Sequence, residues 1–162
     1  MTGQEREWWI EIPASVLRDA VDATTWTFAQ GVKASEKYHL RCRRPIPAEA
    51  DTQGHPVRFS VVWSCDNGEI PPAPAEETEM TNFERQLCQA LEYDGLAFLV
   101  AVLTQRGSRH WVFYTFDGYA CGARIAKKML GREKRYPIEM IAANDPMWSF
   151  VRTGIFDNPP QS

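Results

Sequence analysis

Apolar and polar residues follow a helical period most clearly in the middle of the chain. In TEMTNFERQLCQALEYDG (78–95), apolar residues recur every three or four positions, and Gly95 provides a stop signal. Thr81 and Glu84 stand at the spacing of a capping box, with Thr78 as an alternative start. The stretch therefore predicts a helix, and the residues expected on its buried face are Met80, Phe83, Leu87, Ala90 and Leu91.

The residues after this helix predict a β-hairpin. LAFLVAVLT (96–104) and RHWVFYTFD (109–117) are rich in β-branched and aromatic residues, and a short turn with a glycine separates them. The second strand is apolar on both faces, with Trp111 and Phe113 on one side and Val112, Tyr114 and Phe116 on the other. A sheet with two apolar faces must be covered on both sides.

One more helix and two more strands complete this part of the chain. Asp117 is a good N-cap for GYACGARIAKKML (118–130), which ends before Gly131. The alternating stretch VRFSVVWSC (57–65) and the later RYPIEMIAA (135–143) are typical of strands. The predicted apolar face of this second helix comprises Tyr119, Gly122, Ile125, Ala126 and Met129.

The element order from residue 57 onward is strand, helix, strand, strand, helix, strand. This order predicts an α+β fold of the split βαβ, or ferredoxin-like, type, with four strands and both helices on one face. Right-handed crossovers predict 57–65 and 135–143 as the two middle strands of the sheet. We expect one domain over 1–162, with a core at 57–150 and a tail at 151–162.

Residues 1–56 predict an N-terminal β-hairpin that extends this sheet. TWTFAQG (25–31) and EKYHLRCRR (36–44) are its two strands; WWIEI (8–12) reads as a further strand, and PASVLRDAVDA (13–23) as a short helix. We expect this segment to cover the second apolar face of the sheet. Dimerisation stays open as an additional way of covering it.

Composition and charge narrow the classes of partner. The chain has 162 residues, a formal charge of -3 and a pI near 5.6, so it offers no general attraction for nucleic acid. RCRR (41–44) lies on a predicted strand, and REKR (132–135) fits a helix end, where cations are favoured. No apolar run approaches the 18 residues of a membrane span. We therefore expect a cytoplasmic protein.

Cysteine and histidine positions argue against a compact metal site. The four cysteines lie far apart in the sequence without a C-x-x-C pair, at Cys42, Cys65, Cys88 and Cys121. His39 and Cys42 are three residues apart on a predicted strand and so point to opposite faces. We expect no metal ion and no cofactor.

Few residues offer chemistry. The sequence lacks the nucleophile-elbow, phosphate-loop, dinucleotide and zinc-protease motifs, so we expect no catalytic residue. In AANDPMWSF, Asp145 precedes a proline, a pattern that favours a capped corner over a catalytic carboxylate. The only pocket or partner surface that the sequence suggests consists of His110, Tyr114, Asp145 and Trp148.

The order of short motifs resembles a bacterial family catalogued as domain of unknown function 695. These motifs are TWTFAQG, YHLRCR, FERQLCQAL, WVFYTFD, YPIEM and NDPMWSF, between about residues 24 and 150. The resemblance implies a ferredoxin-type α+β domain and supplies no catalytic residue. The terminal pattern is also similar to that of the inhibitor-B regulators of ribonuclease E, although the chain lacks their long acidic stretches.

Three functions stay open at this point. The leading hypothesis is a non-enzymatic interaction or regulatory domain that holds a protein partner on a sheet edge or an aromatic surface. The alternative is an enzyme or small-ligand binder with a pocket near Asp145. The third is nucleic-acid binding through RCRR and REKR, which the acidic balance of the chain disfavours.

Overall fold

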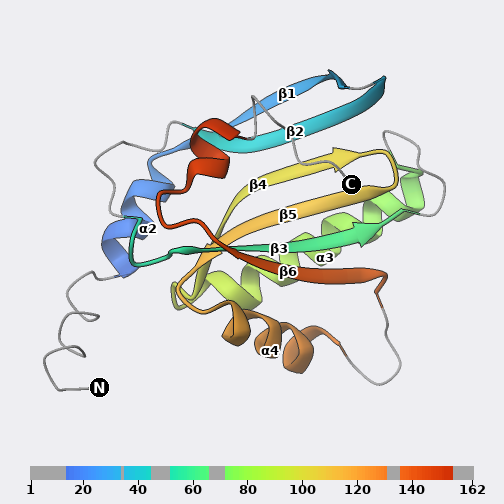
Figure 1. Cartoon of the computed structure of the whole chain (residues 1–162). Helices are drawn as coiled ribbons and strands as arrows, with labels where there is room; N and C mark the ends of the chain where they lie inside the picture. The colour runs from blue at the N-terminus through green and yellow to red at the C-terminus, as the bar shows by residue number, and fades with distance from the viewer. Residues whose placement is uncertain (1–13, 34, 45–51, 66–71, 131–135, 155–162) are drawn as a thin grey trace, which may run out of the picture.

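The computed structural model describes residues 14–33, 35–44, 52–65, 72–130 and 136–154, and these residues form an α+β fold (Figure 1). The strands are β1 (Thr25–Lys33), β2 (Glu36–Arg44), β3 (Val57–Ser64), β4 (Ala97–Gln105), β5 (Ser108–Thr115) and β6 (Ile138–Asn144). The helices are α2 (Ala14–Asp22), α3 (Pro74–Glu92), α4 (Gly118–Met129) and a short π-helix, η1 (Phe150–Gly154). The predicted strand at 8–12 and the REKR run lie outside the described residues.

The six strands make one antiparallel sheet in the order β1-β2-β4-β5-β3-β6. The predicted N-terminal hairpin is confirmed, because β1 pairs with β2 along its whole length and β2 pairs with β4. The expectation that 135–143 is a middle strand is wrong. β6 pairs only with β3 and lies at an edge, because the hairpin of β4 and β5 occupies the other side of β3.

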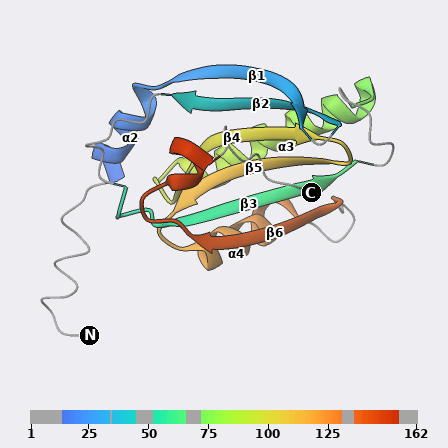
Figure 2. The same ribbon diagram turned by 45° about the horizontal axis from the view of Figure 1, so that its top comes forward.

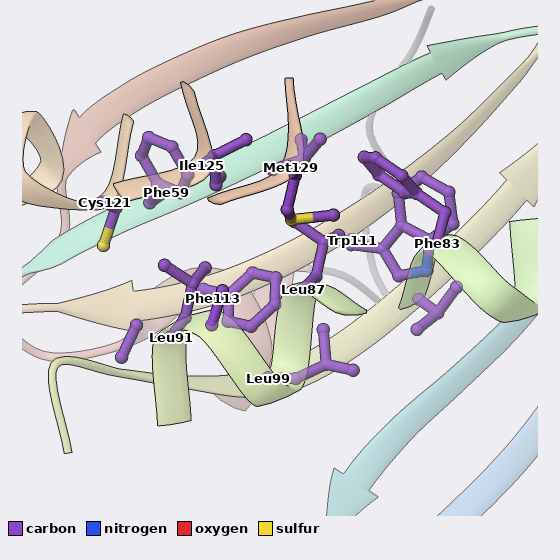
Figure 3. Packing of buried hydrophobic residues seen from close by; sticks show 14 of the residues in the cluster. Phe59, Phe83, Leu87, Leu91, Leu99, Trp111, Phe113, Cys121, Ile125 and Met129 are labelled. Atoms are coloured by element: carbon purple, nitrogen blue, oxygen red, sulfur yellow. The ribbon is translucent and has the colours of Figure 1, made fainter. Parts of the chain in front are cut away.

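α3 and α4 cover one face of the sheet (Figure 2). Figure 3 shows Leu87 and Leu91 of α3 beside Phe113 of β5, and Ile125 of α4 beside Phe59 of β3. All five of these side chains are buried. Burying a large apolar side chain contributes about 1.5–3 kcal/mol, so this interior is the main source of stability on this face.

α2 and η1 cover part of the opposite face (Figure 1). Leu17 of α2 and Trp148 and Val151 near the C-terminal end pack against buried residues of β4 and β5 such as Phe98 and Tyr114. The need for two covers was thus predicted correctly. We expect this second cover from the N-terminal segment, with dimerisation as an additional cover, and the structure shows that the residues around η1 supply part of it.

The predicted capping box at the start of α3 is wrong. The helix begins about two turns before Thr81 and about one turn before Thr78, with Pro74 in its first turn, where the fixed φ of proline suits a helix and the missing N–H costs nothing. Thr78 and Thr81 therefore lie inside the helix, and each hydroxyl donates to the carbonyl four residues earlier. The predicted buried face of α3 is confirmed in full.

α4 begins as predicted, because the Asp117 carboxylate accepts a hydrogen bond from the Ala120 amide at 3.0 Å. Its predicted apolar face is only partly correct. Ile125 and Met129 are buried, whereas Tyr119 is 89% exposed. The buried stripe of α4 runs through Cys121, so Tyr119 lies on a flank of the helix.

Candidate functional site

Three of the four residues suggested by the sequence meet at one corner of the sheet. The Tyr114 hydroxyl donates to the Asp145 carboxylate at 2.6 Å, and the Tyr114 and Trp148 rings stack with centroids 4.3 Å apart. The Trp148 indole donates to the His55 carbonyl at 2.8 Å. We call Tyr114, Asp145 and Trp148 the corner cluster.

Hydrogen bonds to the chain occupy the Asp145 carboxylate. Besides Tyr114, it accepts from the backbone amides of Ser149 at 2.9 Å and Phe150 at 3.0 Å. The Asp145 amide donates to the Pro56 carbonyl, which closes the end of β6 onto β3. The carboxylate therefore fixes the turn that begins the C-terminal segment, in agreement with the corner interpretation of the sequence.

The two aromatic rings of the corner cluster are closed to ligands. Tyr114 and Trp148 are each 0% exposed. Burial, together with the Asp145 carboxylate, raises the pKa of Tyr114 far above its ordinary value, so the phenol holds its proton firmly. A fully buried phenol that must remain protonated is a structural group and a poor proton donor in catalysis.

His110 does not join this cluster. It lies four residues before Tyr114 on β5, and its Nε2 is 3.1 Å from the Ser108 hydroxyl and 3.5 Å from the Gln105 amide. Four strand residues span about 13 Å, so the two side chains share a face without contact. Burial lowers the pKa of His110.

An open groove lies elsewhere, between α3 and the β1–β2 hairpin. Its volume is about 680 Å³. Its floor is the helix-side face of β1, β2 and β4, and its wall is α3, because the hairpin extends the sheet beyond the area that the helices cover (Figure 2). The residues lining this α3–hairpin groove are Phe28, Ala29, Gln30, His39, Leu40, Arg41, Glu77, Thr81, Glu84, Val102, Thr104 and Arg109.

Two ion pairs cross the groove from sheet to helix. Arg109 donates to both carboxylate oxygens of Glu77, at 2.9 and 2.8 Å, and its Nε donates to the Thr104 hydroxyl. Arg41 pairs with Glu84, which also accepts from the Trp111 indole at 2.9 Å. These bonds tie the wall of the groove to its floor and hold most of its charge in neutral pairs.

Aromatic and cationic side chains continue along the floor of the groove. The guanidinium groups of Arg41 and Arg43 both lie over the Trp26 ring, 5.0 and 4.5 Å from its centroid. Phe28 is the neighbour of Arg41 across the hairpin and is 77% exposed. An aromatic ring exposed beside a hollow offers a large apolar contact area to a bound molecule.

A partly buried pair of polar side chains, one thiol and one carboxylate, lies near Arg41 and Arg43. Cys88 and Glu92 of α3 are hydrogen-bonded to each other, and burial raises the pKa of both. The nearby Glu92 and Glu84 carboxylates raise the pKa of the Cys88 thiol further. This thiol is therefore a poor nucleophile at neutral pH.

No sequence pattern predicted this groove, although the basic run at 41–44 lies beside it on β2. Alternation along that strand places Arg41 and Arg43 on the helix side and Cys42 in the interior of the other face. His39 lines the groove, so His39 and Cys42 point to opposite faces as predicted. The sequence pattern does not show that α3 covers the sheet only as far as β4 and leaves the helix side of the hairpin exposed.

Two further properties bear on the class of protein. In the part of the chain that the structure describes, no three side chains of histidine, cysteine, aspartate or glutamate come together in an arrangement that holds a metal ion. None of the described helices combines the length and apolar character needed to cross a bilayer.

Comparison with known proteins places the chain in a family. The resemblance to the inhibitor-B regulators of ribonuclease E finds no support, because neither the curated proteins nor the solved structures gave a match. The sequence model of one family matches residues 25–153, a range that contains β1 through η1 apart from the last residue of η1 and includes both the groove and the corner cluster. The chain therefore belongs to the family of unknown function DUF695.

Proposed function

We propose that this protein is a non-enzymatic binding domain that holds a segment of a protein partner in the α3–hairpin groove. The observation that carries the proposal is the open groove of about 680 Å³ with Phe28 77% exposed on its floor. A segment with an apolar side chain over Phe28 and polar groups near His39 and Gln30 matches this lining.

The charge pattern of the groove supports a protein segment over a nucleic acid. Glu77 and Glu84 stand on the wall and neutralise Arg109 and Arg41. A phosphate backbone in this groove would meet two carboxylates, which repel it. A peptide carries its own balance of charges and backbone hydrogen-bonding groups, so it loses less on entering.

A substitution in the groove wall tests this proposal. Thr81 lines the groove and Thr78 lies one turn away on the same helix; both are exposed and both hydroxyls donate to a carbonyl four residues earlier. Thr81→Arg fills the groove, and Thr78→Arg is its matched control. In affinity capture from host lysate, we expect T81R to lose at least tenfold in the recovery of a partner that T78R retains. Equal recovery by both variants would refute the groove as the binding surface.

A small ligand in the same groove is the second candidate, because about 680 Å³ falls within the usual range of ligand pockets. It predicts that a metabolite raises the thermal midpoint of the wild-type chain and of T78R but not of T81R. A compound that stabilises all three chains equally would bind elsewhere and contradict this candidate.

We also propose the ferredoxin-like description for the part of the fold from β3 to β6. Support comes from the strand order β4-β5-β3-β6, from the antiparallel pairing of each neighbour, and from α3 and α4 lying on one face. On this description the β1–β2 hairpin is an addition beside β4, and it is this addition that creates the groove.

A further inference from the structure

The edge strand β6 presents free backbone groups in a surface of mostly apolar side chains. Just outside the two ends of β6, the Pro137 carbonyl accepts from the Ser64 amide of β3, and the Asp145 amide donates to the Pro56 carbonyl directly before β3. Because inward and outward backbone groups alternate along a strand, Met140, Ala142 and Asn144 direct their N–H and C=O groups away from β3. No strand lies beyond β6 in the described ranges.

Among the described residues, β6 lacks three of the features with which proteins commonly protect an edge strand: a bulge, a basic side chain and a proline. Its register with β3 contains no bulge, and Ile138–Asn144 contain no lysine, arginine or proline. Its apolar side chains are exposed on both faces, with Met140 at 38% on the helix side and Ile141 at 49% on the other. The opposite edge differs, since β1 contains Gly31 and ends in Lys33.

The flank of α4 beside β6 continues this surface in the helix layer. One flank of α4 faces α3, where Arg124 pairs with Asp94 and Lys128 lies over Tyr93. The opposite flank, on the side of β6, carries a stripe without charge at helical spacing. Its residues are Tyr119, Gly122, Ala123 and Ala126, and Gly122 lies beside the Met140 sulfur.

We propose that two copies of this chain associate through their β6 edges and these α4 flanks, so that one sheet continues through both copies. A two-fold axis at Ile141 pairs the whole strand with itself. Met140 then faces Ala142 of the second copy, Ile141 faces Ile141, and the only charge on the strand, Glu139, faces Ala143. This register brings no two like charges together, which makes the strand complementary to itself.

The arrangement of both layers favours a second copy over an unrelated strand. A lone added strand would satisfy the outward backbone groups and leave the stripe on α4 uncovered. A second copy brings its own α4 to the same position, and alanine and glycine at the contact allow the two helices to approach closely. The inference is independent of the groove, which lies beside the other edge of the sheet.

Sedimentation velocity of the full chain between 1 and 100 µM tests the association. We expect a species of twice the 18.5 kDa chain mass. Ile141→Lys places two cations opposite each other on the axis, so we expect its dissociation constant to rise at least tenfold. Val32→Lys, at a 65% exposed position on the β1 edge outside the groove, is the control and leaves the dimer unchanged. A monomeric wild-type chain, or a dimer that V32K disrupts and I141K does not, overturns the proposal.

Cysteine crosslinking tests the register itself. Residues that face each other in a non-hydrogen-bonded pair have Cα atoms about 4.5 Å apart, within reach of a disulfide. Under mild oxidation, we expect Ile141→Cys to form a covalent dimer well above the wild-type background. Glu139→Cys is the control, because its two copies lie about 14 Å apart in this register. Crosslinking of E139C but not of I141C overturns the proposed pairing.

Discussion

The corner cluster and the α3–hairpin groove are built from the same kinds of residue but differ in exposure to solvent. Both combine aromatic rings with carboxylates, and in both the carboxylates accept several hydrogen bonds. In the corner the rings are 0% exposed and stack on each other, whereas Phe28 in the groove is 77% exposed. The buried corner cluster therefore stabilises the fold, whereas the exposed groove is available to a partner.

The two regions differ in exposure because different elements cover the sheet at each of them. The corner lies where α2 and the C-terminal segment meet the sheet, so every ring there has a neighbour. The hairpin side of the groove lies past the edge of α3, so its floor faces solvent. The two regions consequently predict different responses to substitution: loss of stability at the corner, and loss of binding at the groove.

The largest expected effect is that of Trp148→Ala. This change removes a fully buried indole, its stack on Tyr114 and its bond to the His55 carbonyl. We expect the free energy of unfolding to fall by about 3–5 kcal/mol. Urea denaturation followed by circular dichroism measures it. A loss below about 1 kcal/mol would show that the corner is not the stabilising region described above.

Asp145→Ala has the next largest effect. It leaves the buried Tyr114 hydroxyl and the amides of Ser149 and Phe150 without their acceptor, so we expect a loss of about 2–3 kcal/mol in urea denaturation. Tyr114→Phe is the matched comparison. It keeps the ring and the two amide bonds, and we expect it to cost about 1 kcal/mol. If Y114F costs more than D145A, the carboxylate does not organise the corner.

The corner also predicts a dependence of stability on pH through His55. This side chain is 4% exposed; its Nε2 bonds to the Gly95 carbonyl, and its Nδ1 has no hydrogen-bond partner among the described residues. Burial lowers the pKa of His55 below its ordinary 6.5, so the unfolded chain takes up the proton first as the pH falls. The stability that the neutral His55 contributes is therefore retained above pH 6.5 and lost as the pH falls below it.

Comparison of the wild-type chain with His55→Gln isolates this effect. His110, whose pKa burial also lowers, acts in the same direction, whereas the raised pKa of Glu92 acts in the opposite one. Both groups are present in each chain. We expect the unfolding free energy of H55Q to fall less between pH 7.5 and 5.5. Identical slopes for the two chains would contradict a buried neutral His55.

The smallest effect on stability is expected in the groove. Phe28→Ala removes a ring that is 77% exposed, so we expect a change within about 0.5 kcal/mol. Val32→Ala, at a 65% exposed position on the same strand that does not line the groove, is the control. Partner capture should fall for F28A and stay unchanged for V32A. A marked loss of stability in F28A would mean that the ring packs against the body of the protein.

The sequence predicted the helices and strands better than their arrangement in the sheet. The period of α3, the Asp117 cap and both hairpins depend on residues close together in the sequence, and the structure confirms them. The edge position of β6 and the early start of α3 were not predicted correctly. The position of β6 depends on which strands pair with the two sides of β3. Strand pairing between distant segments is not determined by any local sequence pattern.

For the candidate sites too, the sequence predicted local features but not the arrangement of distant ones. Tyr114 and Trp148 could be placed near Asp145 because the aspartate–proline turn and the strand alternation are local signals. His110 was assigned to the same site from strand parity, which fixes a face but not a distance. The groove exists because the N-terminal hairpin extends the sheet past the area that α3 covers. That relation between distant segments can be seen only in the three-dimensional structure.

Hydrogen exchange measured by mass spectrometry, on the chain alone and bound to its captured partner, tests the central claim most directly. If the groove is the binding surface, the partner slows exchange in the strands around Phe28 and Arg41 and in α3 near Thr81. Exchange from Asp145 to Val151 stays unchanged, because the corner is already closed. Slowed exchange at the corner with none in the groove would contradict the account.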